Sequence, residues 1–248
     1  MRPAEGHTRK DCMPEEGEIH LWARNLDHEK FPMEKIANTL SREELEHGRE
    51  YIQDVDRIYY YSRRLILREI LARYADIEAS QLRFSHGAHG KPYLDKAHNR
   101  SNLQFSLSFS RPVLLIAVTK HHPIGADIER IKPDIDFKNI ARRFYSKEEN
   151  EYLQNLEAYE RIREFFRIWT MKEAHLKATG VGLSKEPASF TVPIKYAPLP
   201  GIDLPGLYFN NQIHYFCLHE SLLQGSYKAT LASQEKIKSI SILSWLQR

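Results

Sequence analysis

The sequence repeats one order of elements, and this repeat restricts the fold more than any other feature. Ser41 with Glu44, and Ser146 with Glu149 105 residues later, both match the S-x-x-E capping box that opens a helix. Each box is followed by a long helical pattern and then by several extended stretches. Two halves with the same order of elements indicate an ancient duplication.

The hydrophobic periodicity predicts one long helix and several short strands in each half. In the first half, the helix covers residues 56–74, and extended segments are predicted at 18–22, 81–85, 103–109 and 113–119. In the second half, the helix covers about residues 161–178, and extended segments are predicted near residues 189, 213 and 227.

The expected fold class is therefore α+β. We predict two similar lobes related by a pseudo-two-fold axis, each with a long helix packed on a small antiparallel sheet. The predicted division is a polar tail at residues 1–17, an N-terminal lobe at 18–121 and a C-terminal lobe at 122–248. A cleft between the lobes is the expected ligand site.

Composition excludes several classes of protein. The two cysteines, Cys12 and Cys217, have no CxxC spacing, so neither a disulfide framework nor a zinc cluster is supported. The longest apolar run, residues 113–118, is too short to span a membrane. A net charge of +3 without an RNP-like motif or a long basic tract disfavours an RNA-binding domain. We expect a soluble, cytoplasmic protein that binds neither membrane nor nucleic acid.

Two carboxylates in the middle of the chain form a candidate cation site. In HPIGADIERIKP, apolar residues alternate with Gly125, Asp127 and Glu129, so a strand would place both acids on one face. A solvated surface strand is equally consistent with this pattern. A bound cation would convert the repulsion between the two acids into attraction.

A second candidate segment is WTMKEAHLKATGVGL, residues 169–183. Glu173 offers a third oxygen ligand, and Lys177 lies one turn further on the same face. An ordinary helix ion pair would look the same, although Trp169 argues for partial burial. Carboxylates without cysteine or suitably spaced histidine favour Mg²⁺ over Zn²⁺, and Mg²⁺ suggests a phosphate-bearing substrate. Gly180 is consistent with a helix C-cap or with a loop that turns back to the site.

Four motifs occur in a specific order: GKPYL at 90–94, GADIE at 125–129, FYSKEE at 144–149 and WTMKEAHLKATGVGL at 169–183. Together they resemble the 4′-phosphopantetheinyl transferases of the surfactin-synthetase-activating type, a monomeric class with two similar halves. The likeness spans roughly residues 40–232. It implies transfer of the 4′-phosphopantetheine arm from coenzyme A to a serine of an acyl or peptidyl carrier protein, with release of 3′,5′-ADP.

The resemblance also implies roles for individual residues. It places Mg²⁺ on Asp127, Glu129 and Glu173, and a phosphate-contacting lysine at Lys177. Glu173 is by analogy the group that takes the serine proton, and Asp127 and Lys177 complete the catalytic set. The further contacts with coenzyme A come from Gly90, Lys91, Pro92, Ser108 and Lys172, with Lys91 and Pro92 at the adenine end and Lys172 at a phosphate.

A surface for the acidic carrier protein is expected in the segment from Arg130 to Tyr145. There Lys138, Arg142 and Arg143 stand beside apolar residues, which suits an acidic amphipathic helix. An ordinary amphipathic helix with a basic outer face would look the same.

Three positions depart from the family pattern. Relatives hold the 3′-phosphate of coenzyme A with basic residues in the first helical segment and with a histidine in an FNxSHS strand. Here Glu44 and His47 stand at the basic positions. The strand reads FSLSFS, with Phe109 at the position of the histidine. An acid facing a phosphate is unfavourable, and Phe109 donates no hydrogen bond.

Three explanations of these departures are open. Other cations take over the phosphate, for which Arg49, Arg57, Arg63 and His86 are the candidates. Alternatively, the donor lacks the 3′-phosphate, or the chain is a degenerate relative that binds a carrier protein or a nucleotide without turnover. Because the acids and Lys177 are intact, we favour an enzyme, and we predict weak discrimination between coenzyme A and dephospho-coenzyme A.

Overall fold

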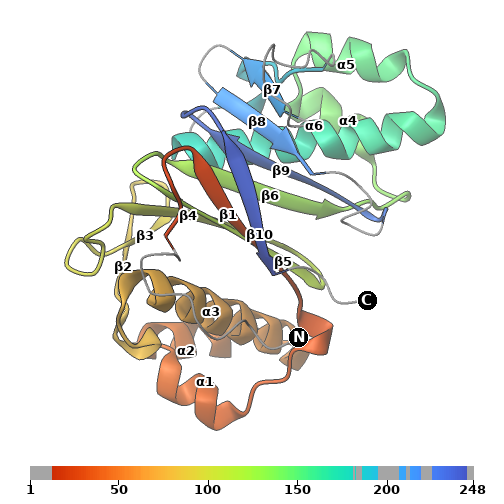
Figure 1. Ribbon diagram of the computed structural model, residues 1–248. Coiled ribbons are helices and arrows are strands. Elements are labelled where there is room, and N and C mark those ends of the chain that lie inside the picture. The colour runs from red at the N-terminus through yellow and green to blue at the C-terminus, as the bar shows by residue number, and fades with distance from the viewer. Residues whose placement is uncertain are drawn as a thin grey trace.

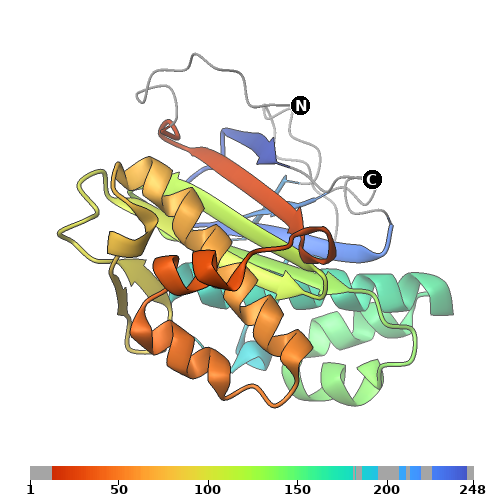
Figure 2. The same cartoon turned by 90° about the horizontal axis from the view of Figure 1, so that it is seen from below.

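The computed structural model describes residues 13–180, 182, 186–194, 207–210, 213–218 and 225–244. Two four-stranded sheets pack against each other, and a 22-residue helix covers the outer face of each (Figures 1 and 2). The order of layers is helix, sheet, sheet, helix. The fold is α+β, as the sequence predicts.

The first half of the chain supplies one helical layer and most of one sheet. In this sheet β1 and β4 both pair antiparallel with β5, and the order is β10-β1-β5-β4. Two short strands, β2 and β3, form a separate hairpin. The elements are β1 (Glu18–Asn25), α1 (Met33–Thr39), α2 (Arg42–Arg49), α3 (Asp54–Ala75), β2 (Phe84–His86), β3 (Pro92–Leu94), β4 (Leu103–Ser110) and β5 (Val113–Lys120).

The second half repeats this order. Its antiparallel sheet has the order β6-β9-β8-β7, in which β6, β9 and β8 correspond to β1, β5 and β4. The elements are β6 (Ile124–Arg130), α4 (Phe137–Phe144), α5 (Lys147–Gln154), α6 (Ala158–Thr179), β7 (Leu207–Asn210), β8 (Ile213–Cys217) and β9 (Tyr227–Ser233). Near residue 189 the sequence predicted an extended segment, but Pro187–Ser189 forms a 3-10 turn.

The last strand, β10 (Ser239–Ser244), returns to the first half of the molecule and pairs parallel with β1. The sequence did not predict this pairing of β10 with β1. The expected boundary at residue 121 falls in the link between β5 and β6. β10 follows this boundary in the sequence but belongs to the sheet of the first half. Of the expected tail, residues 1–12 lie outside the described residues.

Both predicted capping boxes are present. The Ser41 hydroxyl accepts a hydrogen bond from the Glu44 N–H, and the Glu44 carboxylate accepts one from the Ser41 N–H. Ser146 and Glu149 make the same pair of bonds at the start of α5. Each glutamate is also buried against the long helix that follows it, so each box anchors its helix in the core.

Among the described residues, three of the apolar cores lie between the layers. One lies between the two sheets and joins residues such as Leu115 and Ala117 of β5 with Ile124, Ala126 and Ile128 of β6. The other two lie between each sheet and its own long helix. Burial of apolar surface in these cores is the main stabilising contribution.

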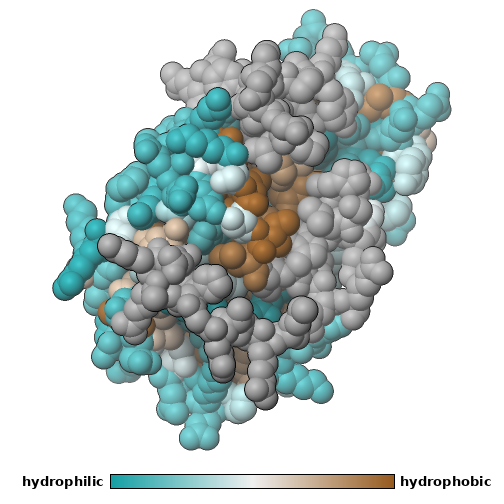
Figure 3. Space-filling view, in the orientation of Figure 1, coloured by the Kyte–Doolittle hydropathy of each residue, from teal (hydrophilic) through white to brown (hydrophobic). Residues whose placement is uncertain are grey.

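In the view of Figure 3, hydrophilic side chains dominate the periphery, and apolar side chains gather near the centre of this face. Exposed apolar residues include Ile242 and Leu243 of β10. None of the described helices combines the length and the apolar character needed to cross a bilayer.

Candidate active site

A pocket of about 250 Å³ lies between β4, the last turns of α6 and the loop that joins β2 to β3. Five of the residues predicted for the site line it: Gly90 and Lys91 from the loop, Pro92 at the start of β3, and Glu173 and Lys177 from α6. The fold thus brings together residues that are more than 80 positions apart in the sequence.

The absence of a side chain at Gly125 allows α6 to lie directly on β6. A Cβ atom at this position would lie 1.9 Å from the carbonyl oxygen of Ala174 and 2.6 Å from the backbone nitrogen of Ala178. Asp127 lies two residues further on the same face of β6, so its carboxylate meets the side chain of Lys177. The close packing therefore sets the distance between the carboxylate of Asp127 on β6 and the ammonium of Lys177 on α6.

Asp127 is buried, with only 3% of the residue exposed. The alternative of a solvated strand face, which the sequence left open, does not apply to this residue. Its Oδ1 accepts a hydrogen bond from the Ser108 hydroxyl at 2.8 Å and one from the Lys177 ammonium at 2.7 Å. Its Oδ2 is buried and has no hydrogen-bond partner among the described residues. A buried carboxylate oxygen without a donor is unfavourable, so this oxygen is suited to a cation.

Burial and the negative charge of Asp127 affect the pKa of both Glu129 and Glu173. Burial, and then the negative charge of Asp127, raise the pKa of both carboxyl groups. Glu129 Oε2 accepts a hydrogen bond from the Ser110 hydroxyl at 3.0 Å. Glu173 reaches the pocket, and it has no hydrogen bond or ion pair with a described residue. Each of the three acids therefore has at least one oxygen without a hydrogen bond to a described residue.

The donor set suits a hard cation, although the three acids are too widely spaced to share one ion without moving. All the donors are carboxylate oxygens, and the unpartnered Oδ2 of Asp127 is one of them. Oxygens of Asp127, Glu129 and Glu173 do not all lie within 4.8 Å of one another. Two oxygens on one Mg²⁺ are at most about 4.2 Å apart, so the glutamate side chains have to adjust on binding.

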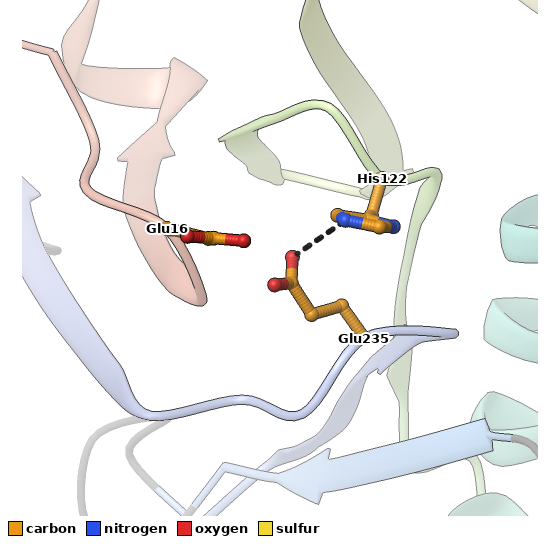
Figure 4. A group of neighbouring side chains, drawn as sticks. All are labelled: Glu16, His122 and Glu235. Carbon is orange, nitrogen blue, oxygen red and sulfur yellow. Dashed lines mark ion pairs between the residues drawn. The ribbon is translucent and has the colours of Figure 1, made fainter.

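A different group of potential ligands lies away from the pocket lining (Figure 4). It consists of Glu16 before β1, His122 in the link between β5 and β6, and Glu235 after β9. The Nε2 atom of His122 lies 3.4 Å from a carboxylate oxygen of Glu235. An ion pair accounts for this contact, and we assign it no catalytic role.

A row of buried serines on β4 supports the acids, and the sequence analysis missed two of its three members. Ser106, Ser108 and Ser110 occupy alternate positions and face β6. Ser106 and Ser110 accept hydrogen bonds from the backbone N–H groups of Ala126 and Arg130. Ser108 donates its proton to Asp127, so it orients an acid, a role that the predicted contact with coenzyme A did not include. The signal was three serines at a spacing of two that alternate with Phe105, Leu107 and Phe109.

Lys91 ties the β2–β3 loop to the second half of the molecule. Its ammonium donates hydrogen bonds to the carbonyl oxygens of Ile124 at 2.9 Å and Lys177 at 2.6 Å. Burial, and then the charge of the nearby Lys177, lower the pKa of Lys91 to about 8. The third ammonium proton remains for a ligand in the pocket.

Lys172 does not reach the pocket, and this placement contradicts its expected contact with a phosphate. It is 2% exposed, and its ammonium lies 2.8 Å from the Glu149 carboxylate. It also donates hydrogen bonds to the carbonyl oxygens of Pro187 and Phe190. The sequence could not separate Lys172 from Lys177 because both are helix lysines in one motif, and only packing shows which of them faces the core.

Gly180, the residue after α6, both caps the helix and lines the pocket. Gly180 has φ = +70° and its N–H donates to the carbonyl oxygen of Leu176, so it ends the helix in the left-handed conformation. Gly180 and Gly182 both line the pocket. The two interpretations of Gly180 made from the sequence are therefore compatible.

The two residues at the family's basic positions do not offer a free charge. The Glu44 carboxylate is buried and accepts hydrogen bonds from the guanidinium groups of Arg64 and Arg68, at 2.6 Å each. It is neutralised within the core, so the expected repulsion of a phosphate does not arise. His47 is exposed and lies 2.9 Å from a carboxylate oxygen of Glu50.

Comparisons with known proteins find related sequences. The family model of the 4′-phosphopantetheinyl transferase superfamily matches residues 123–232. HetI of Nostoc sp., a 4′-phosphopantetheinyl transferase, is 38% identical over 168 residues, which are 68% of this chain and 71% of HetI. Sfp of Bacillus subtilis is 31% identical over 69% of this chain and 74% of its own length. The protein gsp of Aneurinibacillus migulanus is 30% identical over 60% of this chain and 59% of its own length.

The chain belongs to the 4′-phosphopantetheinyl transferase family. The resemblance of the four motifs is thereby confirmed. The transferase moves phosphopantetheine to carrier proteins, which is the reaction of this family.

Replacing Lys172 with Met in the transferase is expected to lower the free energy of unfolding by about 3 kcal/mol. The change leaves the fully buried carboxylate of Glu149 without its ion-pair partner. Urea denaturation measures this loss, with the exposed Lys147→Met as the matched control, for which we expect a change within about 0.5 kcal/mol. A weaker affinity for the donor at unchanged stability would contradict the structural role.

Replacing Glu173 with Gln is expected to stabilise the metal-free transferase at neutral pH but not near pH 4. The folded-state pKa of Glu173 is raised, so folding favours its protonated form. Its contribution to stability is complete below the ordinary glutamate pKa and is lost as the pH rises through the raised folded-state pKa. Glutamine cannot ionise, so the variant does not lose this stability as the pH rises.

Thermal unfolding at both pH values tests this pH dependence, with Glu160→Gln, an exposed position on the same helix, as the control. A Glu173→Gln variant that is less stable than the wild type at pH 7 would show that the ionised carboxylate is stabilising.

Proposed function

We propose that the transferase takes the phosphopantetheine arm from coenzyme A and joins it to a serine hydroxyl of an acyl or peptidyl carrier protein. The serine oxygen forms a bond to the phosphorus next to the arm. The bond from this phosphorus to the bridging oxygen breaks, and 3′,5′-ADP leaves with that oxygen. The observation that carries the proposal is the buried Asp127 with one unpartnered oxygen, next to Lys177 at the pocket wall.

The acids and the serines prepare this site for a divalent ion. Mg²⁺ held by Asp127, Glu129 and Glu173 would neutralise the pyrophosphate and stabilise the charge on the leaving oxygen. Ser108 and Ser110 orient the first two carboxylates from β4. Because these serines are buried between the sheets, their hydrogen bonds are protected from competition with water.

Glu173 is the group best placed to accept the serine proton. Its carboxylate enters the pocket without a hydrogen bond to a described residue. Its raised pKa makes it a stronger proton acceptor near neutral pH than an ordinary glutamate. The same glutamate cannot be bound by a cation through both oxygens while it accepts the proton, so we assign one oxygen to each task.

Lys177 supplies a positive charge where the phosphates bind. Its ammonium is held by Asp127 Oδ1 at 2.7 Å and by the carbonyl oxygen of Ala126 at 3.1 Å. Its side chain is 30% exposed, which leaves one side open to the pocket. We place the adenine end of coenzyme A at Gly90, Lys91 and Pro92, which line the same pocket.

The carrier protein docks, in this proposal, on α4. Lys138, Arg142 and Arg143 are exposed there, and none of them is ion-paired with a described residue. The partly buried Phe144 lies beside them. An acidic helix of the carrier complements this charge, which favours encounter with the correct partner.

We also infer that a pseudo-two-fold axis relates two lobes of one monomer. The support is the repeated order of capping box, 22-residue helix and three antiparallel strands in both halves.

The test is to incubate an apo carrier protein with coenzyme A and Mg²⁺ and to measure the mass of the carrier. We expect the phosphopantetheine increment, and we expect none with a carrier that lacks the acceptor serine or with a chelator in place of Mg²⁺. Carrier binding without any mass gain would instead favour a degenerate, non-catalytic relative.

A further inference from the structure

Three side chains that the active site does not use point toward one another at the junction between the two halves (Figure 4). Glu16 precedes β1, His122 lies in the link from β5 to β6, and Glu235 follows β9. One carboxylate oxygen of each glutamate and one ring nitrogen of the histidine all lie within 4.8 Å of one another. Two carboxylates and an imidazole, each from a different segment, therefore face one small volume.

The protein does not balance the charges of this cluster. Among the described residues, Glu235 forms an ion pair only with His122, and Glu16 forms none. Lys236 and Lys238 follow in the sequence, but neither has an ion pair with a described residue. A protonated imidazole offsets one of the two carboxylates, and a neutral imidazole offsets neither. The cluster therefore carries excess negative charge, which a cation can neutralise.

The distance between His122 and Glu235 fits a transition metal. Nε2 of the imidazole lies 3.4 Å from Oε2 of the carboxylate, which is longer than a charge-assisted hydrogen bond of about 2.8 Å. Bonds of about 2.0–2.1 Å from a tetrahedral zinc ion to an imidazole nitrogen and a carboxylate oxygen place these two atoms about 3.4 Å apart. Glu16 is exposed, so rotation of its side chain can bring its oxygen to the third position.

The imidazole determines the class of metal. Mg²⁺ and Ca²⁺ take oxygen ligands, whereas an imidazole together with carboxylates favours Zn²⁺. The acids of the active site, Asp127, Glu129 and Glu173, offer oxygen atoms only. The two groups of ligands are therefore expected to select different metals.

The backbone holds the three segments in place before any metal binds. The Lys238 N–H donates a hydrogen bond to the carbonyl oxygen of Gly17, next to Glu16, at 2.9 Å. β1 pairs antiparallel with β5, and the chain continues from β5 into the link that carries His122. Ligands that are already positioned lose little conformational freedom on binding, which favours affinity.

We propose that Glu16, His122 and Glu235 bind one Zn²⁺ ion, with water in the remaining position, as a structural site separate from the catalytic pocket. None of the three residues lines that pocket. The ion connects the segment before β1, the link between the two halves and the segment between β9 and β10. Because these ligands converge only in the folded chain, the ion stabilises the native state. The inference does not depend on the proposed reaction.

Calorimetric titration of the full chain with Zn²⁺, in excess Mg²⁺ to occupy the all-carboxylate site, tests the assignment. We expect one zinc ion per chain in the wild type. Each of Glu16→Gln, His122→Ala and Glu235→Gln should weaken this binding by about tenfold or more, since even the loss of an outer-shell partner costs about tenfold to 100-fold. Glu15→Gln and His121→Asn, at neighbouring positions outside the cluster, are the matched controls and should bind Zn²⁺ like the wild type.

Thermal unfolding gives a second readout. Zn²⁺ should raise the Tm of the wild type and of both controls, because an ion that binds only the folded state stabilises that state. The Tm of His122→Ala should not respond to Zn²⁺. Glu16→Gln changes an exposed side chain, so it should fold like the wild type and still lose most of the response to Zn²⁺.

A wild type that binds no Zn²⁺ in excess Mg²⁺ would overturn the proposal. So would an affinity for Zn²⁺ that is unchanged in both His122→Ala and Glu235→Gln, because the ion would then be bound elsewhere on the chain. A zinc-dependent rise in Tm that persists in His122→Ala would contradict the proposal in the same way.

Discussion

Replacing Asp127 with Asn is expected to lower kcat/KM for carrier modification by about 1,000-fold, which corresponds to about 4 kcal/mol of transition-state stabilisation. The amide keeps the shape of the side chain and one oxygen for Ser108, so the fold should persist. It removes the negative charge that faces Lys177 and the unpartnered oxygen suited to a cation. Both changes act where charge develops on the phosphates.

The mass increment of the carrier, followed over time and over a range of Mg²⁺ concentrations, measures this effect. Wild-type activity should rise with Mg²⁺, whereas Asp127→Asn should stay nearly flat. Asp134→Asn, at an exposed position just beyond β6, is the matched control and should retain full activity. If Asp127→Asn keeps more than about a tenth of the activity, with circular dichroism unchanged, the acid is not central to the chemistry.

Replacing Gly125 with Ala is expected to destabilise the fold by more than about 4 kcal/mol, a large effect for one methyl group. The new Cβ would lie 1.9 Å from the carbonyl oxygen of Ala174 and 2.6 Å from the nitrogen of Ala178. Both are backbone atoms of α6, so no side-chain rotation relieves the clash. The helix has to move away from β6, and this opens the core that the two elements share.

Urea unfolding measures this cost, and Gly225→Ala is the control. Gly225 has φ = +70°, and a Cβ there meets no atom within 4 Å, so only backbone strain of about 1–2 kcal/mol is expected. Similar small losses in both variants would show that α6 does not pack tightly on β6. Because Glu173 and Lys177 lie on α6, any folded Gly125→Ala protein should also have reduced activity.

Features with a local cause were predictable from the sequence. A capping box needs only two residues three positions apart, and both boxes are present with all four hydrogen bonds. The two long helices begin and end within three residues of their predicted limits, because a long apolar periodicity defines them. The order of the four motifs also indicated the family, because it can be read along the chain without knowledge of the packing.

Features that depend on packing between distant segments were not predictable. The return of β10 to pair with β1 joins residues more than 200 positions apart, and no local pattern signals it. Ser108 was expected at the coenzyme and was found to hold Asp127, because the sequence does not show that β4 and β6 lie side by side. The corrected role of Glu44 also depends on two arginines from the next helix.

The amino-acid sequence by itself predicts the two long helices and which acids share a strand face, because these follow from local spacing, and the order of four motifs along the chain indicates the family. Only the tertiary structure decides that Lys177 meets Asp127 while Lys172 is buried against Glu149. It likewise leaves Arg63 without an acidic partner among the residues that the structure describes, while Arg64 and Arg68 are paired with Glu44. The physical reason is that the environment of a charge depends on which elements pack against it, and residues of the same type on one helix face different neighbours.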